Sequence, residues 1–440
     1  MTSENQTELK KGKGSDISGF HKMAPEERLN IVKEFAGLTE KEIEILRKNG
    51  GMDMDLADRM IENVIGTGEL PFGIATNFLV NGKDYLVPMT IEEPSVVAAA
   101  SFAAKLARPA GGFKASSSEP VMIGQIQLVG IKDFEKAKEN ILNEKNDMIK
   151  YANDTDPAVL VKYGGGLRDI EVREIETQRG KMLVVHLLID CRDAMGANAV
   201  NTLCECLAPR LEKLTGGESR LRIISNLAVY RTARAEAVWK KEMLENSVKN
   251  EMSGEEVVDR ILDAYAFAEA DQFRCSTHNK GIMNGIDAVT LATGNDFRAI
   301  EAGAHSYAAK DGRYKPLTKY RKNENGDLVG EIELPLAVAI VGGATMTKPT
   351  AKIALKILNV KTAKELAEVM AAVGLAQNFA ALRALATEGI QHGHMRLHAK
   401  NIAVMAGAKG DMIDVVAQKM IEEKKIRVDR AKEILKEMAE

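Results

Sequence analysis

The first part of the chain shows two amphipathic patterns followed by two short apolar runs. Residues 25–49 carry apolar side chains at helical spacing between charged ones, which predicts a helix. The same spacing predicts a second helix over residues 56–65. The apolar runs 74–80 and 85–89 are joined by Asn81-Gly82, and this combination is a strong signal for a β-hairpin.

A block of mixed strand and helix patterns follows. Its edges are the Gly- and Ser-rich stretch 111–119 and the region of Tyr230. Within them we predict strands over 121–130, 170–176, 182–189 and 220–227, and helices over 134–151 and 194–214. The block spans about 110 residues, the size of one small α+β domain.

After Tyr230 the spacing of apolar residues is mainly helical. We predict a strand over 331–341, a helix after Gly281, and helices over 235–246, 254–271, 349–358, 362–385 and 412–440. Gly374 is a candidate interruption of the longest of these helices. The whole pattern predicts an α+β protein: a large, mainly helical part, with a small mixed block between about residues 119 and 230.

Composition narrows the class of protein. The formal net charge of −3 gives no reason to expect nucleic acid, and no apolar run reaches the ~18 residues of a membrane-spanning helix. The polar N-terminus, MTSENQTELKKGKGSD, has no apolar signal core and is expected to be a flexible tail. The four cysteines show neither a disulfide framework nor zinc spacing. We therefore expect a soluble, cytoplasmic protein without a metal.

Two carboxylates, Glu92 and Glu93, precede an alanine-rich helix predicted over residues 94–107. Acidic residues at a helix start commonly stabilise the helix dipole. Alternatively, apolar surroundings could raise the pKa of one of them, so that it acts as a general acid.

A cation and a carboxylate stand close together further along the chain. Lys280 lies between Asn279 and Asn284, and Asp296 follows in the turn Ala-Thr-Gly-Asn-Asp. A lysine held by amides and a carboxylate can stabilise a developing oxyanion. The alternative interpretation is a salt bridge on the protein surface.

Three of the seven histidines, His392, His394 and His398, lie within one short run. Side chains two residues apart do not share a helix face, and no acidic ligand is close in sequence, so a metal site is disfavoured. One histidine acting as a proton donor near neutral pH fits better.

No GxGxxG or P-loop motif is present. The turn Asp193-Ala-Met-Gly-Ala-Asn198 follows an apolar strand and opens a helix, which Asp193 could cap. Free N–H groups at that helix start, with Gly196 allowing close approach, could bind a cofactor phosphate. The alternative is an ordinary strand-to-helix turn.

Taken together, these segments resemble the 3-hydroxy-3-methylglutaryl-coenzyme A (HMG-CoA) reductases of class II, the soluble bacterial and archaeal group. The resemblance runs from about Phe20 to the C-terminus. It is carried by these stretches in this order: ENVIGT from Glu62, LVPMTIEEPS from Leu86, DAMGAN from Asp193, HNKGIMN from His278, ATGND from Ala292 and GHM from Gly393.

The resemblance implies a role for each matching residue. The family's catalytic glutamate falls at Glu93, because this residue directly precedes Pro94-Ser95, and its lysine, aspartate and histidine fall at Lys280, Asp296 and His394. Further matches are Ser95, Arg274 and Asn284 for the hydroxymethylglutaryl group, and Asp193, Met195, Gly196 and Asn198 for the cofactor. The implied reaction reduces HMG-CoA to mevalonate and coenzyme A with two NAD(P)H, by way of a hemithioacetal and mevaldehyde, in isoprenoid biosynthesis. The same chemistry run oxidatively, in mevalonate degradation, is the alternative.

The resemblance also implies an organisation. Residues 1–119 and 231–386 would bind HMG-CoA and form the dimer, residues 120–230 would form a non-Rossmann cofactor domain, and residues 387–440 a mobile helical flap. Active sites would be shared within a homodimer, or within a trimer of dimers. Either His21 or Lys22 would meet coenzyme A. Asp156 would favour NADH over NADPH by repelling the 2′-phosphate, unless Lys162 or Arg168 reverses that preference.

Overall fold

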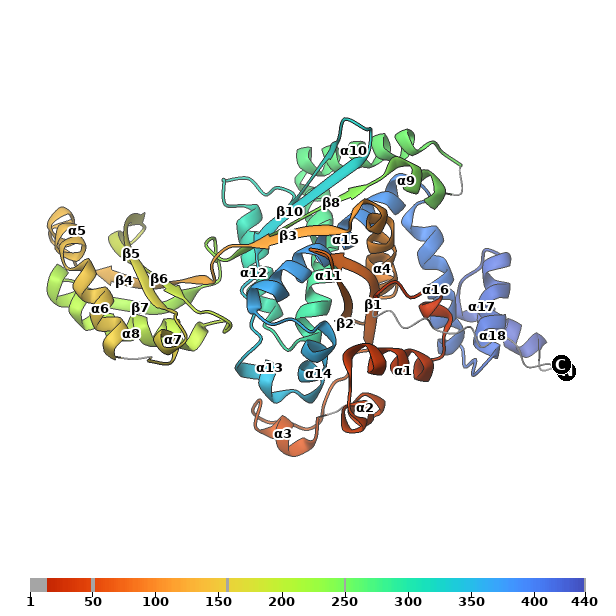
Figure 1. Ribbon diagram of the computed structural model, residues 1–440, viewed down its shortest axis with the longest axis horizontal. Helices are drawn as coiled ribbons and strands as arrows, with labels where there is room; N and C mark the ends of the chain where they lie inside the picture. Colours follow the sequence, from red (N-terminus) through yellow and green to blue (C-terminus); the bar gives the residue numbers. More distant parts are fainter. Residues whose placement is uncertain (1–13, 49–51, 156–157, 249–250, 439–440) are drawn as a thin grey trace.

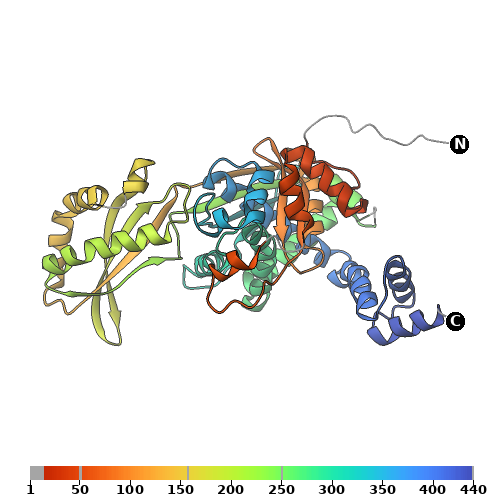
Figure 2. The same ribbon diagram turned by 90° about the horizontal axis from the view of Figure 1, so that it is seen from below.

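The computed structural model describes residues 14–48, 52–155, 158–248 and 251–438, without the side chains of 155, 158–159, 344 and 390–397. Figure 1 shows three parts along the longest axis: a small sheet with its helices at one end, a larger central part, and helices near the C-terminus at the other end. The view from below in Figure 2 shows the same separation. The predicted α+β class is confirmed.

A six-stranded sheet forms the middle of the central part. Its strands lie in the order β2-β1-β3-β8-β10-β9. Their bounds are Lys83–Thr90 (β2), Phe72–Val80 (β1), Phe113–Ser117 (β3), Thr232–Trp239 (β8), Leu328–Pro335 (β10) and Thr318–Lys322 (β9). Because β3 and β8 pair although some 115 residues separate them, the intervening chain leaves and re-enters at one place. The mixed block of residues 121–230 therefore lies within an excursion between β3 and β8.

The hairpin predicted at Asn81-Gly82 is confirmed. Strands β1 and β2 pair antiparallel with Val80 opposite Lys83, and both turn residues have positive φ, 51° and 78°. This is the geometry that makes Asn-Gly favourable in a two-residue hairpin.

The helix predicted over residues 235–246 was wrong in its first half. That stretch is strand β8, followed by helix α9 (Lys241–Ser247). The residues Thr-Ala-Arg-Ala-Glu-Ala-Val-Trp alternate in burial, with Ala233, Ala235, Ala237 and Trp239 buried. High alanine content suggested a helix, but the period of two in burial is that of a strand. Strands β3 and β9 were also not predicted.

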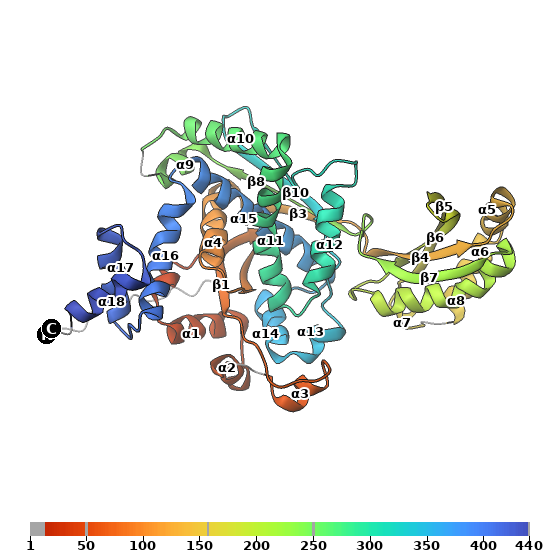
Figure 3. The same ribbon diagram turned by 180° about the vertical axis from the view of Figure 1, so that it is seen from behind.

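Helices pack against this sheet. The main ones are α4 (Val96–Ala107), α10 (Gly254–Ala270), α11 (Gln272–Ala292), α12 (Phe297–Ala308) and α15 (Ala363–Ala386). Figure 3 shows α11 and α12 side by side. Helix α11 begins nine residues before Gly281, so the predicted start after that glycine was wrong.

Helix α15 runs without the interruption predicted at Gly374. It is long and apolar enough to cross a membrane, with a mean hydropathy of 1.4, but 78% of that window is buried within the protein. Its apolar character is thus explained by its position in the core.

The inserted part is a four-stranded antiparallel sheet in the order β5-β6-β4-β7. The strands are β4 (Val121–Val129), β5 (Gly166–Thr177), β6 (Gly180–Asp190) and β7 (Glu218–Ser225), with helices α5 (Phe134–Asn143), α6 (Lys145–Thr155), α7 (Ala158–Lys162) and α8 (Ala197–Thr215). The predicted helix over 134–151 is therefore two helices. This part has its own apolar core, in which α8 covers the sheet.

The remaining helices are mostly short. Before β1 lie η1 (Phe20–Lys22), α1 (Pro25–Ala36), α2 (Glu40–Arg47) and α3 (Met54–Asp58), and η2 (Arg108–Ala110) directly follows α4. Two helices directly precede α15, α13 (Gly343–Thr347) and α14 (Pro349–Leu358). Three follow it, α16 (Ile390–Met405), α17 (Met412–Glu422) and α18 (Val428–Glu437). Helix α3 ends at Asp58, so the prediction of a helix over 56–65 was wrong. Helices α16, α17 and α18 share a separate apolar core.

Trp239, the single tryptophan of the chain, is fully buried in the central core. Its ring stacks on Phe379 with centroids 3.9 Å apart, and its Nε1 donates to the carbonyl of Ala103 at 3.1 Å. These contacts join β8, α15 and α4.

Replacing Phe379 by leucine removes the stacked ring and leaves a small cavity. We expect Phe379→Leu to lower the free energy of unfolding by about 1–3 kcal/mol. Trp239 fluorescence during guanidinium unfolding measures this directly. Tyr163→Leu, at a side chain that is 71% exposed in the inserted part, serves as the control and should leave the midpoint unchanged. Equal midpoints for Phe379→Leu and the wild type would contradict the assigned packing.

Candidate active site

Lys280 and Glu93, two of the predicted catalytic residues, contact each other. The Nζ of Lys280 lies 2.8 Å from Oε2 of Glu93, with side chains 60% and 35% exposed. Lys280 comes from the middle of α11, and Glu93 from the segment between β2 and α4. The carboxylate that meets Lys280 in this structure is therefore Glu93, and the pair is open to a ligand from one side.

Ser95 starts α4 in an unusual backbone conformation. It is the N-cap residue, its φ is 78°, and its side chain makes no capping hydrogen bond. A positive φ in a residue other than glycine costs about 1–2 kcal/mol. Such strain is tolerated where the surroundings impose it, and it is frequent at functional sites. Here it leaves the Ser95 hydroxyl uncommitted to the helix, two residues from Glu93.

Asp296 is the N-cap residue of α12. Its Oδ1 accepts from the amides of Arg298 (3.0 Å) and Ala299 (3.2 Å) and also pairs with the Arg298 guanidinium. Within the described residues it makes no hydrogen bond or ion pair with Lys280. The predicted direct contact between this aspartate and the lysine is therefore not seen.

Arg274 and Asn284 lie on α11 with Lys280. Asn284 follows Lys280 by one helical turn and is half-buried on the same face. Arg274 is in the first turn, and burial lowers the pKa of its guanidinium. The helix thus presents a cation and an amide side by side, with a second cation nearer its start.

Asn279 does not hold Lys280 as expected. It is fully buried; its Nδ2 donates to the carbonyl of Lys315 and its Oδ1 accepts from the amide of Leu317. These bonds fix the segment before β9 to α11. The expectation that the Asn279 amide holds Lys280 was wrong, because adjacent residues of a helix point about 100° apart.

His394 lies in α16, and its side chain belongs to the part of the helix that the structure does not describe, as does that of His392. His398 is exposed. Among the described residues, no group of three or more His, Cys, Asp or Glu is arranged to hold a metal ion.

The turn from Asp193 to Asn198 has the predicted strand-turn-helix form, but Asp193 does not cap the helix that follows. Its Oδ1 accepts from the amide of Ala363 at 2.7 Å, at the start of α15. Helix α8 starts at Gly196 without any side-chain cap. Its first N–H groups therefore remain available to an anion.

Gly196 is required for the packing of the turn itself. A Cβ there would lie 2.2 Å from Sγ of Cys191, and its φ is 101°. The missing side chain thus makes room for the buried cysteine and for the backbone turn.

The sequence did not reveal Arg231, which holds this turn in place. Arg231 is 5% exposed and donates to the carbonyls of Ala194 (2.9 Å), Met195 (3.2 Å) and Val338 (2.6 Å). Its guanidinium thereby ties the turn to the central part. Its position at the end of the inserted part was the one available clue.

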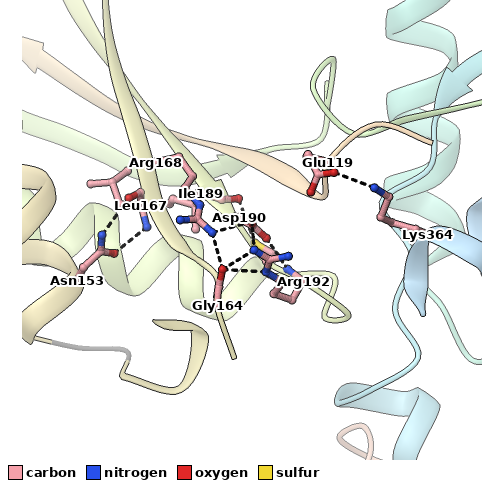
Figure 4. Close-up of polar contacts among 10 residues, drawn as sticks. Glu119, Asn153, Gly164, Leu167, Arg168, Ile189, Asp190, Arg192 and Lys364 are labelled. Atoms are coloured by element: carbon pink, nitrogen blue, oxygen red, sulfur yellow. Dashed lines mark hydrogen bonds and ion pairs between the residues drawn. The ribbon is translucent and has the colours of Figure 1, made fainter. Parts of the chain in front are cut away.

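Two further arginines converge beside the turn (Figure 4). The guanidinium groups of Arg168 and Arg192 both contact the carbonyl oxygen of Gly164 and Oδ2 of Asp190, which is buried. Two positive charges share one carboxylate, which leaves one net positive charge, with each arginine side chain 39–49% exposed. Lys162 is exposed, and Asp156 lies outside the described residues.

One ion pair connects the inserted part to the central part in the same view. Glu119 Oε1 lies 2.8 Å from Lys364 Nζ, across the gap between the two parts (Figure 4). Lys364 holds the pKa of Glu119 below its ordinary value, and the charges of Arg192 and Arg168 add to this effect.

A cavity of about 1190 Å³ lies near the N-terminus, between η1, α1, β1 and α4. Its basic lining residues are His21, Arg28, Arg47 and Lys105; Lys22 is not among the residues that line it. It reaches Val97, four residues after Glu93. The cavity therefore runs along α4 toward the segment that carries Glu93.

Comparisons with known proteins agree with one another. The family described as hydroxymethylglutaryl-coenzyme A reductase matches residues 24–399. The 3-hydroxy-3-methylglutaryl-coenzyme A reductase of Archaeoglobus fulgidus is 60% identical over 98% of this chain and 96% of its own length. A probable reductase of the same name from Borreliella burgdorferi is 37% identical over 91% and 89%.

Solved structures give the same answer. The 3-hydroxy-3-methylglutaryl-coenzyme A reductase of Streptococcus pneumoniae is 41% identical, with a TM-score of 0.81 over 96% of this chain and 99% of that one. A structure of the class II enzyme from that organism, bound to NADPH in open conformations, has a TM-score of 0.79 over 95% and 100%. The chain described here belongs to the hydroxymethylglutaryl-coenzyme A reductase family, in its class II group.

Proposed function

We propose that Glu93, Lys280, Asp296 and His394 carry the reduction of HMG-CoA to mevalonate, the reaction of this family. The observation that supports this most strongly is the contact between Glu93 and Lys280, because a cation and a proton donor are needed at one carbonyl carbon. Lys280 donates from Nζ to the thioester oxygen and stabilises the oxyanion of the hemithioacetal.

The later proton transfers need two more groups. When the hemithioacetal collapses, His394 protonates the departing coenzyme A thiolate. Glu93 then donates a proton to the oxygen of mevaldehyde, which Lys280 still holds. We assign Asp296 the tuning of the proton affinity of Lys280 through the local field, although its described contacts lie within α12.

NAD(P)H supplies the two hydrides. The residues near the turn of Asp193, Met195, Gly196 and Asn198 fit such a cofactor, because the start of α8 has uncapped N–H groups and the adjacent arginines carry excess positive charge. Arg231 fixes the turn, and Asp190 holds Arg168 and Arg192 in place. Asp156 was expected to favour NADH. Because Arg168 and Arg192 lie beside the cofactor turn and can attract the 2′-phosphate, we propose that NADPH is accepted as well.

For the substrate, we propose that Ser95, Arg274 and Asn284 bind the hydroxymethylglutaryl group and that the cavity along α4 binds coenzyme A. His21 lines this cavity, which favours it over Lys22 as the residue that meets coenzyme A. Residues 120–230 would then be the cofactor domain, 1–119 and 231–386 the substrate domain, and 387–440 a flap whose movement lets spent cofactor leave between the two reductions.

We further propose that the enzyme is soluble and cytoplasmic and works as a homodimer, or as a trimer of dimers, with active sites shared between subunits. Large apolar side chains lie exposed in segments that carry the family motifs: Ile65 is 100%, Ile61 66% and Phe273 88% exposed. Phe273 directly precedes Arg274. Side chains of this kind are normally covered, and a second copy of the chain is the natural cover.

Lys280→Ala is expected to abolish oxidation of NADH or NADPH in the presence of HMG-CoA. The loss should be at least 1000-fold, because the oxyanion then loses its only charged donor in the proposed mechanism. The assay follows cofactor absorbance with the thioester and, separately, with mevaldehyde; both half-reactions should fail. Lys310→Ala, on an exposed cation away from the site, is the control. Activity within tenfold of the wild type in Lys280→Ala would overturn the assignment.

Ile65→Asp is expected to convert the assembly into a 48.0 kDa monomer and to reduce turnover more than tenfold. Light scattering coupled to size exclusion gives the mass. Leu221→Asp makes the same change at a side chain that is 61% exposed on β7, and it should preserve the dimer contact. A fully active monomer of Ile65→Asp would contradict shared active sites.

A further inference from the structure

A network of four polar side chains connects α11 with α12 and with the segment that follows α12. Asp287 on α11 and Glu301 on α12 share a hydrogen bond between their carboxyl groups. Glu301 Oε2 lies 2.6 Å from Nε2 of His305, one turn further along α12, and Nδ1 of His305 lies 2.7 Å from the hydroxyl of Tyr314. The proposed reaction uses none of these four residues.

Both ends of this network lie at α11. Asp287 belongs to α11 itself. Tyr314, at the other end, directly precedes Lys315, whose carbonyl accepts a hydrogen bond from Asn279 of α11. Burial raises the pKa of the Tyr314 phenol, and a hydrogen bond from Asn279 opposes that rise. The network thus connects α11, α12 and the segment that follows α12, and closes on the residue before Lys280.

The position of Asp287 relates it to the reaction centre. Lys280, Asn284 and Asp287 follow one another at i, i+4 and i+7, so they lie along one face of α11. Side-chain exposure decreases along this face. Lys280 is exposed, whereas Oδ1 of Asp287 is buried and has no hydrogen-bond partner among the described residues. Glu301 lies five residues after Asp296 on the other helix. The Asp287–Glu301 bond therefore joins the helix of Lys280 to the helix that Asp296 caps.

Two carboxyl groups in a direct hydrogen bond need one proton between them. Burial, followed by the bond to Glu301 and the charge of Glu301, raises the pKa of Asp287 to about 8. The hydrogen bond with His305 contributes most to the lowered pKa of Glu301. Near neutral pH, Asp287 is thus the protonated donor and Glu301 the carboxylate acceptor.

We propose that the Asp287–Glu301 pair is a proton-dependent clamp, which positions Lys280 relative to Asp296 by holding α11 against α12. When the shared proton is lost, two half-buried carboxylates face each other and their repulsion separates the helices. Asp287 and Glu301 are then positioning residues for the reaction, and the enzyme loses turnover in alkaline solution through them. This inference rests on the proposed role of Lys280.

Other ionisable groups on the surrounding elements are engaged in contacts of their own. The charge of Glu301 acts on Asp287, and His305 and Asp287 act on Glu301. On α11, α12 and the elements that pack against them, the paired groups are Lys280 with Glu93, Arg298 with Asp296, Tyr307 with Glu333 on β10, Lys83 with Glu365, Asp84 with Arg108, Tyr265 with Glu269 on α10, and Lys356 of α14 with Glu42.

Asp287→Asn tests the clamp, because an amide donates to Glu301 as the protonated carboxyl does but cannot ionise. At pH 7 its kcat should lie within twofold of the wild type. At pH 9, one unit beyond the pKa of about 8, the wild type should lose about tenfold and the variant much less. Glu301→Gln removes the second charge instead and should also extend activity to higher pH, which keeps the test available if one variant folds poorly.

Stability gives a reading that is independent of turnover. The pKa of Asp287 is raised from 3.8 to about 8, so the folded state binds more proton than the unfolded state in that window and the wild type loses stability as the pH rises through it. The melting temperature of Asp287→Asn relative to the wild type should therefore increase from pH 4 to 8. Asp311→Asn, in an exposed pair with Lys315, is the matched control and should move neither profile.

The outcomes separate the possible failures. Coincident alkaline limbs of kcat for Asp287→Asn and the wild type would overturn the positioning role, even with pH-dependent stability. A melting difference that is constant with pH would overturn the shared proton. If the wild type oxidised no NAD(P)H with HMG-CoA, the proposed function would fail, while the melting profiles would still decide whether the pair shares a proton.

Discussion

The close packing of α11 on α15 is the constraint on which the reaction centre depends. A Cβ at Gly285 would lie 2.9 Å from Cβ of Gln377, and a Cβ at Gly374 would lie 2.8 Å from Cδ1 of Ile286, so each helix presents a glycine where the other presses against it. Because α15 is buried along most of its length, α11 is held against the immobile core of the protein. One face of α11 is fixed in this way, and the opposite face is free to carry chemistry.

The other parts of the site are arranged around this helix. Glu93 reaches Lys280 from the segment that links the edge strand β2 to α4, and α12 packs beside α11 and is capped by Asp296. The cofactor turn belongs to the inserted part, but it is tied to the central part by Arg231 and by Asp193, which accepts from the first residue of α15. The helix that positions Lys280 and the turn proposed to bind NAD(P)H thus share one rigid neighbour, α15. The C-terminal helices have a separate core, as a movable segment requires.

Local chemistry made much of the fold predictable from the sequence. The Asn81-Gly82 hairpin, the strands on either side of Gly180 and the edges of the mixed block near residues 119 and 230 all follow from turn residues and hydrophobic period. Strand β8 was missed because its alternating residues are alanines, which favour a helix by propensity while packing as a strand beside Trp239. The helix that overlaps α3 was predicted to extend to residue 65 because Ile61 and Ile65 continue the apolar spacing, but both side chains are exposed in this chain.

The candidate site, like the fold, was predictable only in part. Motif order identified Glu93, Lys280 and Asp296, but spacing could not show that Glu93, 187 residues away, is the partner of Lys280. It also could not show that Asp193 accepts from the first amide of α15 or that Arg231 holds the turn, since both contacts join segments far apart in sequence. Asp287, Glu301, His305 and Tyr314 gave no motif at all. Their connection depends on two helices and a loop meeting in space.

In the proposed reaction, Glu93 and Lys280 act as one unit on one carbonyl group. A double-mutant cycle on kcat/KM for HMG-CoA, with Glu93→Gln, Lys280→Met and the double variant, measures this directly. Strong non-additivity is expected: once Lys280 is lost, the further change at Glu93 should lower kcat/KM by less than about threefold. Full additivity, with the two losses multiplying in the double variant, would contradict it.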